Sequence, residues 1–159
     1  MKNLNLVLGL VAGIQSSVIP APTLGADFRL ISRDAQTAHV LDASAVRHER
    51  DGARSIDFWG AASVPGGDPP ALYLKMTYAF DCQHRRIRGE GLQAFDRSFG
   101  LVFDNPQRSP WHEVPSGQSM PQVYNIACSR GGGAAGLSLH AQSMREALQM
   151  VRSKLGWAR

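Results

Sequence analysis

The residues of this sequence most able to do chemistry are its histidines, its two cysteines and one run of arginines. The histidines are His39, His48, His84, His112 and His140. They show no His-x-x-x-His spacing, which would place two imidazoles on one helix face toward a metal ion. The serines form no Gly-x-Ser-x-Gly elbow, and the aspartates form no recognisable carboxylate pair. The pattern therefore predicts no catalytic residue, no cofactor site and no metal site.

Three arginines lie together directly after the longest apolar alternation in the chain. Only Ile87 interrupts the run formed by Arg85, Arg86 and Arg88. Such a cluster can bind an acidic partner, such as a polyanion or a lipid head group, through its charge. Charged residues also protect an edge strand from pairing with another chain, and this simpler interpretation explains the run equally well. We keep the three arginines as candidate partner-binding residues. Of the two interpretations, we favour the one in which their charges protect an edge strand from pairing.

A second hypothesis assigns the chain an enzymatic role. His84 would then meet the adjacent residues His112 and Glu113 in space to form a hydrolase or metal site, although His84 lies far from them in the sequence. This hypothesis requires one concave pocket that joins the three side chains. A third hypothesis is a structural or assembly role, in which an amphipathic helix at the C-terminus docks on a partner.

Cys82 and Cys128 are the only cysteines. In an exported chain the oxidising environment favours a disulfide between them. Loop entropy assigns a bridge of this span about 4 kcal/mol of stabilisation, as an upper value. The alternative is two free thiols, one of them catalytic, with His84 nearby as a base. That alternative lacks a third group to orient the histidine.

Residues 1–26 have the order of a secretory signal peptide. Lys2 supplies the charged start, Leu4 to Ile14 is an apolar run, and small residues continue to Ala26. The run is too short for a bilayer, which needs about 20 apolar residues, and the mature chain contains no longer one. We therefore expect an exported protein, most simply in the periplasm, with the cell surface or secretion as alternatives.

Composition supports one globular domain. The chain has 159 residues, of which 43% are hydrophobic and 19% charged, and this balance excludes a disordered chain. The formal net charge is +4. That value is small, and the chain lacks a recognition motif, so nucleic acid is not an expected partner. We expect an unknown protein or another envelope component instead.

Alternation of apolar and polar residues predicts a sheet. The expected strands are residues 28–32, 37–41, 45–49, 54–64, 72–82, 92–97 and 100–104. Asp51-Gly52 predicts a type I′ hairpin, because both central residues of that turn need positive φ. Gly89-Glu90-Gly91 predicts another turn.

Two helices are expected after the strands. Ser119 and Pro121 indicate the start of a short helix that ends at Cys128. Residues 131–136 read as a glycine-rich linker, and residues 137–159 as an amphipathic helix capped internally by Ser143. Its apolar positions are Met144, Ala147, Leu148, Val151 and Leu155. The predicted class is α+β, with a small antiparallel sheet, two helices and one disulfide.

Several motifs occur together in a fixed order. Asp81-Cys82 precedes the basic run, residues 111–117 read Trp-His-Glu-Val-Pro-Ser-Gly, and a short segment then ends at Cys128. Together they resemble the bacterial surface-adhesin protein E family over residues 28–129. The resemblance implies a β-rich domain at residues 27–130, pinned by the disulfide. It also implies a non-enzymatic envelope binding module whose ligand is unknown. Trp59 and Trp111 are expected in the core or against the disulfide.

Overall fold

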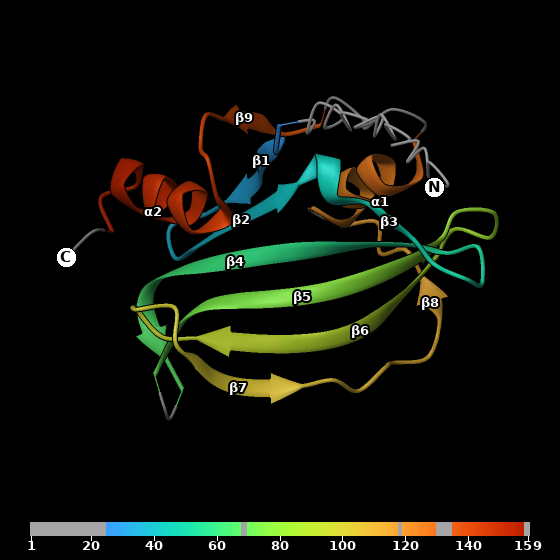
Figure 1. Cartoon of the computed structure of the whole chain (residues 1–159), viewed down its shortest axis with the longest axis horizontal. Helices are drawn as coiled ribbons and strands as arrows, with labels where there is room; N and C mark the ends of the chain where they lie inside the picture. The colour runs from blue at the N-terminus through green and yellow to red at the C-terminus, as the bar shows by residue number, and fades with distance from the viewer. Residues whose placement is uncertain (1–24, 68–69, 118, 130–134, 158–159) are drawn as a thin grey trace, which may run out of the picture.

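In the part of the chain that the structure describes, one antiparallel sheet carries two helices. A computed structural model describes residues 25–67, 70–117, 119–129 and 135–157. The sheet order is β7-β6-β5-β4-β2-β1-β9, with β3 paired to β4 and β8 paired to β6 (Figure 1). The strands are β1 Phe28–Arg33, β2 Thr37–Asp42, β3 Arg47–His48, β4 Arg54–Gly66, β5 Ala71–Asp81, β6 Arg86–Phe95, β7 Leu101–Asn105, β8 His112–Glu113 and β9 Leu137–Leu139; the helices are α1 Met120–Cys128 and α2 Met144–Lys154. The chain is therefore mostly β, with a smaller helical part than a balanced α+β fold.

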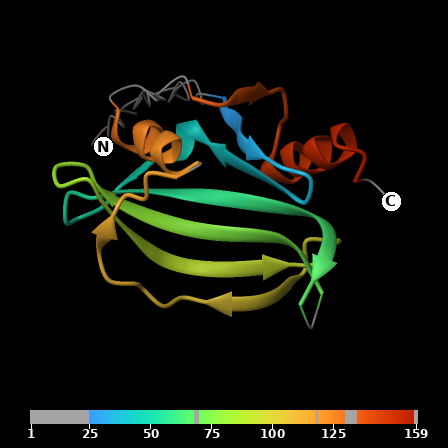
Figure 2. The same ribbon diagram turned by 180° about the vertical axis from the view of Figure 1, so that it is seen from behind.

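The two helices cover opposite faces of the sheet. Val40 and Leu41 are neighbours on β2, so their side chains point to different faces. Leu41 lies in the core cluster that contains Val123 and Ile126 of α1, and Val40 lies in the cluster that contains Leu148 of α2. Seen from both sides, α1 lies toward the end of the sheet that carries β8, and α2 toward the other end (Figures 1 and 2).

The expected turn at Gly89-Glu90-Gly91 is wrong. These residues belong to β6, which pairs with β5 along its whole length and is irregular opposite Thr77 and Tyr78. The two glycines instead allow neighbouring segments of the chain to approach the strand closely. A Cβ on Gly91 would lie 3.3 Å from the carbonyl oxygen of Asn105, and the amide of Gly89 donates to Ser109 Oγ at 2.8 Å.

The hairpin at Asp51-Gly52 exists, but its turn is not type I′. Gly52 has φ +84°, whereas Asp51 is not among the residues with positive φ. The amide of Gly52 donates to the carbonyl of Glu49. The amide of Glu49 in turn donates to the carbonyl of Ala53. This is the pattern of a longer hairpin loop with one left-handed glycine.

The C-terminal segment contributes a strand as well as a helix. The sequence predicted one helix from residue 137, but β9 first adds to the sheet beside β1, and α2 begins at Met144. Ser143 caps α2 as expected, because its hydroxyl accepts from the amide of Glu146. Leu148 and Val151 are buried and Met144 packs against their cluster. The apolar face required by the docking-helix hypothesis is therefore already occupied by the sheet.

Two expectations lie mainly outside the described residues. They are the signal peptide at residues 1–26 and the linker at residues 131–136, of which only the last positions of each are described. Across the parts of the chain that the structure describes, no helix is long and apolar enough to cross a membrane.

Candidate functional site

Asp81 anchors the turn between β5 and β6. Arg86 Nη2 donates to Asp81 Oδ2 at 2.8 Å, and His84 Nδ1 lies 2.8 Å from the same oxygen. The amide of His84 donates to Asp81 Oδ1 at 3.1 Å. The hydrogen bonds from Arg86 and His84 hold the pKa of Asp81 far below its usual range. The carboxylate is therefore ionised at neutral pH and fixes the direction of Arg86.

Trp111 brings two of the candidate arginines together. The guanidinium carbon of Arg88 lies 4.4 Å from the Trp111 ring centroid, and that of Arg86 lies 5.8 Å from it. Both distances are those of cation–π contacts. Arg86 and Arg88 are two residues apart on β6 and therefore share one face of the strand. Trp111 belongs to neither core cluster, so the core placement is wrong, whereas Trp111 and Cys82 of the disulfide line the same cavity.

Carboxylates hold the arginines around Trp111 in place. Arg88 Nε donates to Glu90 Oε1 at 2.6 Å, and Arg88 Nη2 donates to Asp51 Oδ2 at 3.2 Å. Arg108 Nε lies 2.6 Å from Glu90 Oε2. Each pair restrains a long side chain that would otherwise sample many rotamers. The result is a pre-organised array of guanidinium groups. The paired carboxylates offset the repulsion between the positive charges.

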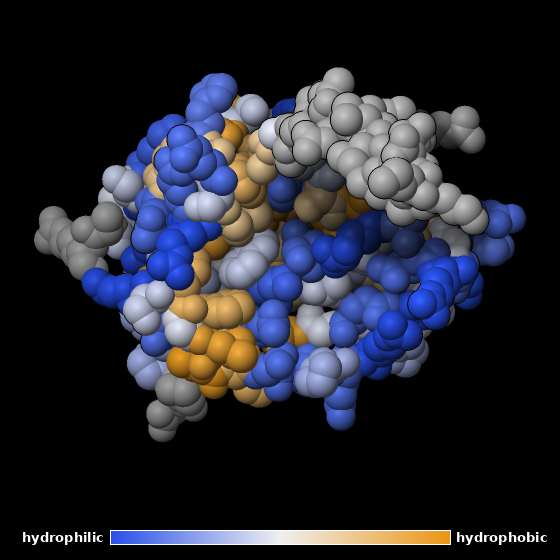
Figure 3. Space-filling view, viewed as in Figure 1, coloured by the Kyte–Doolittle hydropathy of each residue, from blue (hydrophilic) through white to orange (hydrophobic). Residues whose placement is uncertain are grey.

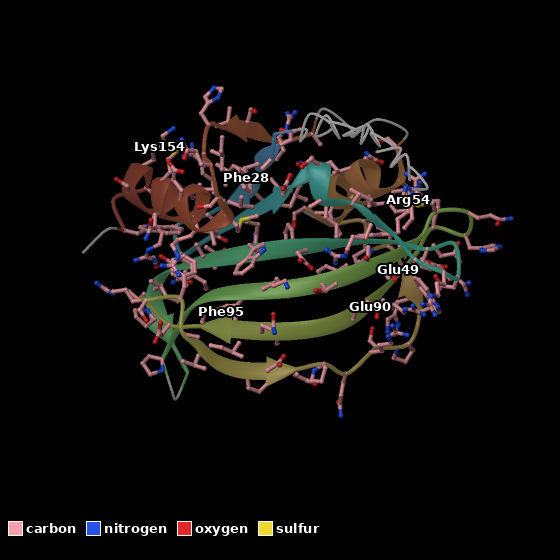
Figure 4. The ribbon with its side chains drawn as sticks, in the orientation of Figure 1. Phe28, Glu49, Arg54, Glu90, Phe95 and Lys154 are labelled. Carbon is pink, nitrogen blue, oxygen red and sulfur yellow. A yellow bond between two sulfur atoms is a disulfide. The ribbon has the colours of Figure 1, made fainter. Side chains whose placement is uncertain are left out.

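Two adjoining cavities open beside this array and share Asp51. The larger, of about 490 Å³, is lined among others by Arg54, Arg86, His84 and Trp111. The smaller, of about 300 Å³, is lined by Glu49, Arg50, Asp51, Arg88 and Arg108. Five arginines and three carboxylates line the two together. Figure 4 shows Glu49, Arg54 and Glu90 at this end of the sheet, where the surface is strongly hydrophilic (Figure 3).

Arg85 is separated from the other two arginines. It has φ 52°, a left-handed conformation that is uncommon for a residue with a side chain. Its guanidinium carbon lies 5.0 Å from the ring centroid of Tyr124 on α1. The structure therefore brings together Arg86 and Arg88 of the predicted run, and directs Arg85 toward the helix.

The interpretation of the arginine run as a guarded edge strand is wrong. β6 lies inside the sheet, because β5 pairs with one side of it and β7 and β8 pair with the other. Arg86 stands opposite Glu113, and Ile87 stands opposite His112. An inner strand has no need of charge to prevent self-pairing, so the arginines require another explanation.

The residues of the enzymatic hypothesis do not converge. His84 lines the larger cavity, but His112 and Glu113 do not. Within the described residues there is no group of three His, Cys, Asp or Glu side chains that can hold a metal ion. A further hollow of about 250 Å³ lies over β2, β4 and β5 near His39 and Leu74, and its lining is almost wholly apolar.

The disulfide prediction is confirmed. Cys82 and Cys128 are bonded to each other with Cα atoms 5.5 Å apart, so the alternative of two free thiols is wrong. The bridge ties the end of β5 to the end of α1. Tyr124 donates its hydroxyl to the carbonyl of Cys82 at 3.0 Å, and Arg54 Nη1 donates to the carbonyl of Ala127 at 3.2 Å. Together these contacts hold one wall of the larger cavity.

Sequence reasoning missed several residues of this site. Arg50, Asp51, Arg54 and Arg108 come from three different loops or strands, and no local pattern marks them as neighbours. One signal was present. The spacing of Arg86 and Arg88 on a strand places both on one face, and an aromatic partner opposite them was a reasonable expectation.

The fold and the site together define a small, disulfide-pinned β-sheet domain with a charged surface suited to contact with another molecule. The chain belongs to the surface-adhesin protein E family, whose sequence profile matches residues 28–129. Membership implies an exported or surface-associated protein with an adhesin-like, non-enzymatic role. Among curated proteins none matches the chain.

A solved structure, crystal form II of Haemophilus influenzae protein E, is similar to the chain with a TM-score of 0.46 and 9% sequence identity. The similarity covers 65% of this chain and 87% of that protein. The match to the family model confirms the expected resemblance to this family.

Proposed function

We propose that the protein is an exported envelope module, located in the periplasm, that binds an acidic segment of a partner protein through the surface around Trp111. The observation that carries the proposal is the placement of Trp111 against Arg88 and Arg86 at the larger cavity. A guanidinium beside an aromatic ring offers a carboxylate both hydrogen bonds and a water-excluding wall.

The charge of the surface supports an acidic partner. Arginines outnumber carboxylates among the residues that line the two cavities. Several of the arginines are already paired, so an incoming carboxylate competes with Asp81 and Glu90 for them. This favours a segment with several acidic groups over a single small anion. We expect the interaction to weaken as salt concentration rises, because exposed charges are screened.

A cross-linking experiment in intact envelopes tests the proposal. A photoreactive amino acid replaces Gln83, an exposed residue that lines the larger cavity. We expect a cross-linked protein partner whose yield drops about tenfold when Arg86 and Arg88 are both changed to alanine. Arg85→Ala is the matched control, because its side chain lies on Tyr124, and it should leave the yield unchanged.

Two results would contradict the proposal. One is a cross-linked partner whose yield does not depend on Arg86 or Arg88. The other is a product formed only with lipid or polysaccharide, which would assign the surface to a head group or polyanion. The intact disulfide and the thermal midpoint of each variant, measured in parallel, establish that the variants are folded.

A further inference from the structure

β7 forms one end of the sheet. It pairs with β6 on one side, and within the described parts of the chain no strand pairs with its other side. The outward backbone N–H and C=O groups of its five residues, Leu101–Asn105, therefore lack partners from this sheet. An edge of this kind is a template on which another extended chain can form hydrogen bonds.

The edge lacks the basic residues and proline that often prevent such pairing, and its one irregularity is a bulge at Val102, where β7 shifts register against Ala94 and Phe95 of β6. β7 reads Leu-Val-Phe-Asp-Asn, without lysine, arginine or proline, and Asp104 is its only charged residue. Leu101 is 53% exposed and Phe103 is 49% exposed. Figure 3 shows hydrophobic surface gathered at the end of the sheet where β7 begins. By contrast, β9 at the opposite edge has only three residues.

Both ends of β7 are held in position. At its start, Asp96 Oδ1 accepts from the amides of Ser98 and Gly100, both at 2.8 Å. Phe99 between them has φ 66° and stacks on Tyr73 with ring centroids 4.1 Å apart. At its end, the carbonyl of Asn105 packs close to Gly91. The edge is therefore pre-organised, which lowers the entropy lost when a second chain binds.

We propose that β7 binds an extended segment of a partner protein as an additional strand of the sheet. The backbone of that segment supplies the hydrogen bonds, which only an extended peptide can provide at this spacing. Its apolar side chains lie against Leu101 and Phe103, and a basic side chain faces Asp104. This surface is distinct from the one around Trp111.

A designed peptide tests the proposal directly. The probe is a short fluorescein-labelled peptide of alternating valine and threonine flanked by lysines, added to the mature chain. We expect binding by fluorescence anisotropy and at least about tenfold slower amide hydrogen exchange within β7. The same peptide with alternate amides N-methylated keeps its side chains but loses the hydrogen bonds, and it should bind at least about tenfold more weakly.

A pair of matched variants places the contact. Leu101→Lys should weaken binding about tenfold, whereas the same change at Leu137, 64% exposed on β9, should leave it unaltered. Equal binding of the methylated peptide, or exchange protection on β9 rather than β7, overturns the proposal. Concentration-dependent self-association that Leu101→Lys abolishes also overturns it, because a second copy would then occupy the edge. The exchange measurement on the unmodified chain remains decisive if a variant fails to fold.

Discussion

Arg88 lies with its guanidinium carbon 4.4 Å from the centroid of the Trp111 ring. Arg88 belongs to β6, and Trp111 directly precedes β8, which pairs with the same strand. The contact is therefore produced by strand pairing between segments that are distant in the sequence. It also joins the two cavities that define the proposed binding surface, because Trp111 lines one and Arg88 lines the other.

The first prediction concerns the energy of this pair. In a double-mutant cycle with Trp111→Leu and Arg88→Ala, we expect a coupling free energy of about 1 kcal/mol, because the Arg88 side chain is largely shielded from water. Urea unfolding measures the free energy of each variant. Arg50 lines the same smaller cavity as Arg88 but forms no cation–π contact with Trp111, so the cycle of Trp111 with Arg50→Ala should give coupling near zero. Equal coupling in both cycles would refute a specific contact.

The second prediction concerns the disulfide. Replacing Cys82 and Cys128 together by serine should lower the free energy of unfolding by about 2 to 4 kcal/mol, because the unfolded chain is no longer cross-linked. Urea unfolding of the variant and of the reduced wild type should agree. Tyr124→Phe, which removes only the hydroxyl bond to the carbonyl of Cys82, should cost about 1 kcal/mol. A double serine variant as stable as the oxidised protein would exclude a stabilising bridge.

The third prediction concerns pH. Burial lowers the pKa of His39 below its ordinary value of 6.5, although Asp34 partly offsets this effect. The unfolded chain therefore binds a proton more readily than the folded chain. Stability conferred by the neutral ring is complete above about pH 6.5 and is lost as the pH falls through the folded-state pKa.

Urea unfolding between about pH 7 and pH 5 tests this prediction. The slope of unfolding free energy against pH should be smaller in His39→Gln than in the wild type. His48→Gln, at an exposed position on β3, controls for the removal of one imidazole from the chain. An unchanged slope in His39→Gln would show that the ring does not titrate differently on folding.

The fourth prediction concerns the terminal helix. Leu148 is fully buried, so Leu148→Ala should reduce the free energy of unfolding by about 2 to 5 kcal/mol through lost burial and a residual cavity. Gln149→Ala, at the exposed neighbouring position, should change it by less than about 0.5 kcal/mol. Differential scanning calorimetry should show one transition for the wild type. A second, independent transition for residues 137–157 would mean that α2 is not part of this core.

Local patterns predicted much of the fold. Alternation located β4 and β5 closely, and helical spacing located α2 together with its cap at Ser143. The failures have local causes as well. Gly89 and Gly91 resemble turn residues in sequence, but in β6 they leave room for Ser109 and for the backbone of Asn105. Asp51-Gly52 predicted the hairpin correctly and its turn type incorrectly, because the dipeptide does not define loop length.

The sequence by itself determined the strand and helix periods and the identity of the only two cysteines. It also contained motifs sufficient to indicate the surface-adhesin protein E family, because these features depend on residues close together or on residue type. The tertiary structure decided that Arg86 and Arg88 meet Trp111 while Arg85 turns toward Tyr124. Side-chain alternation assigns a residue to a face of its strand, but which strands lie side by side depends on long-range register and on packing of the core.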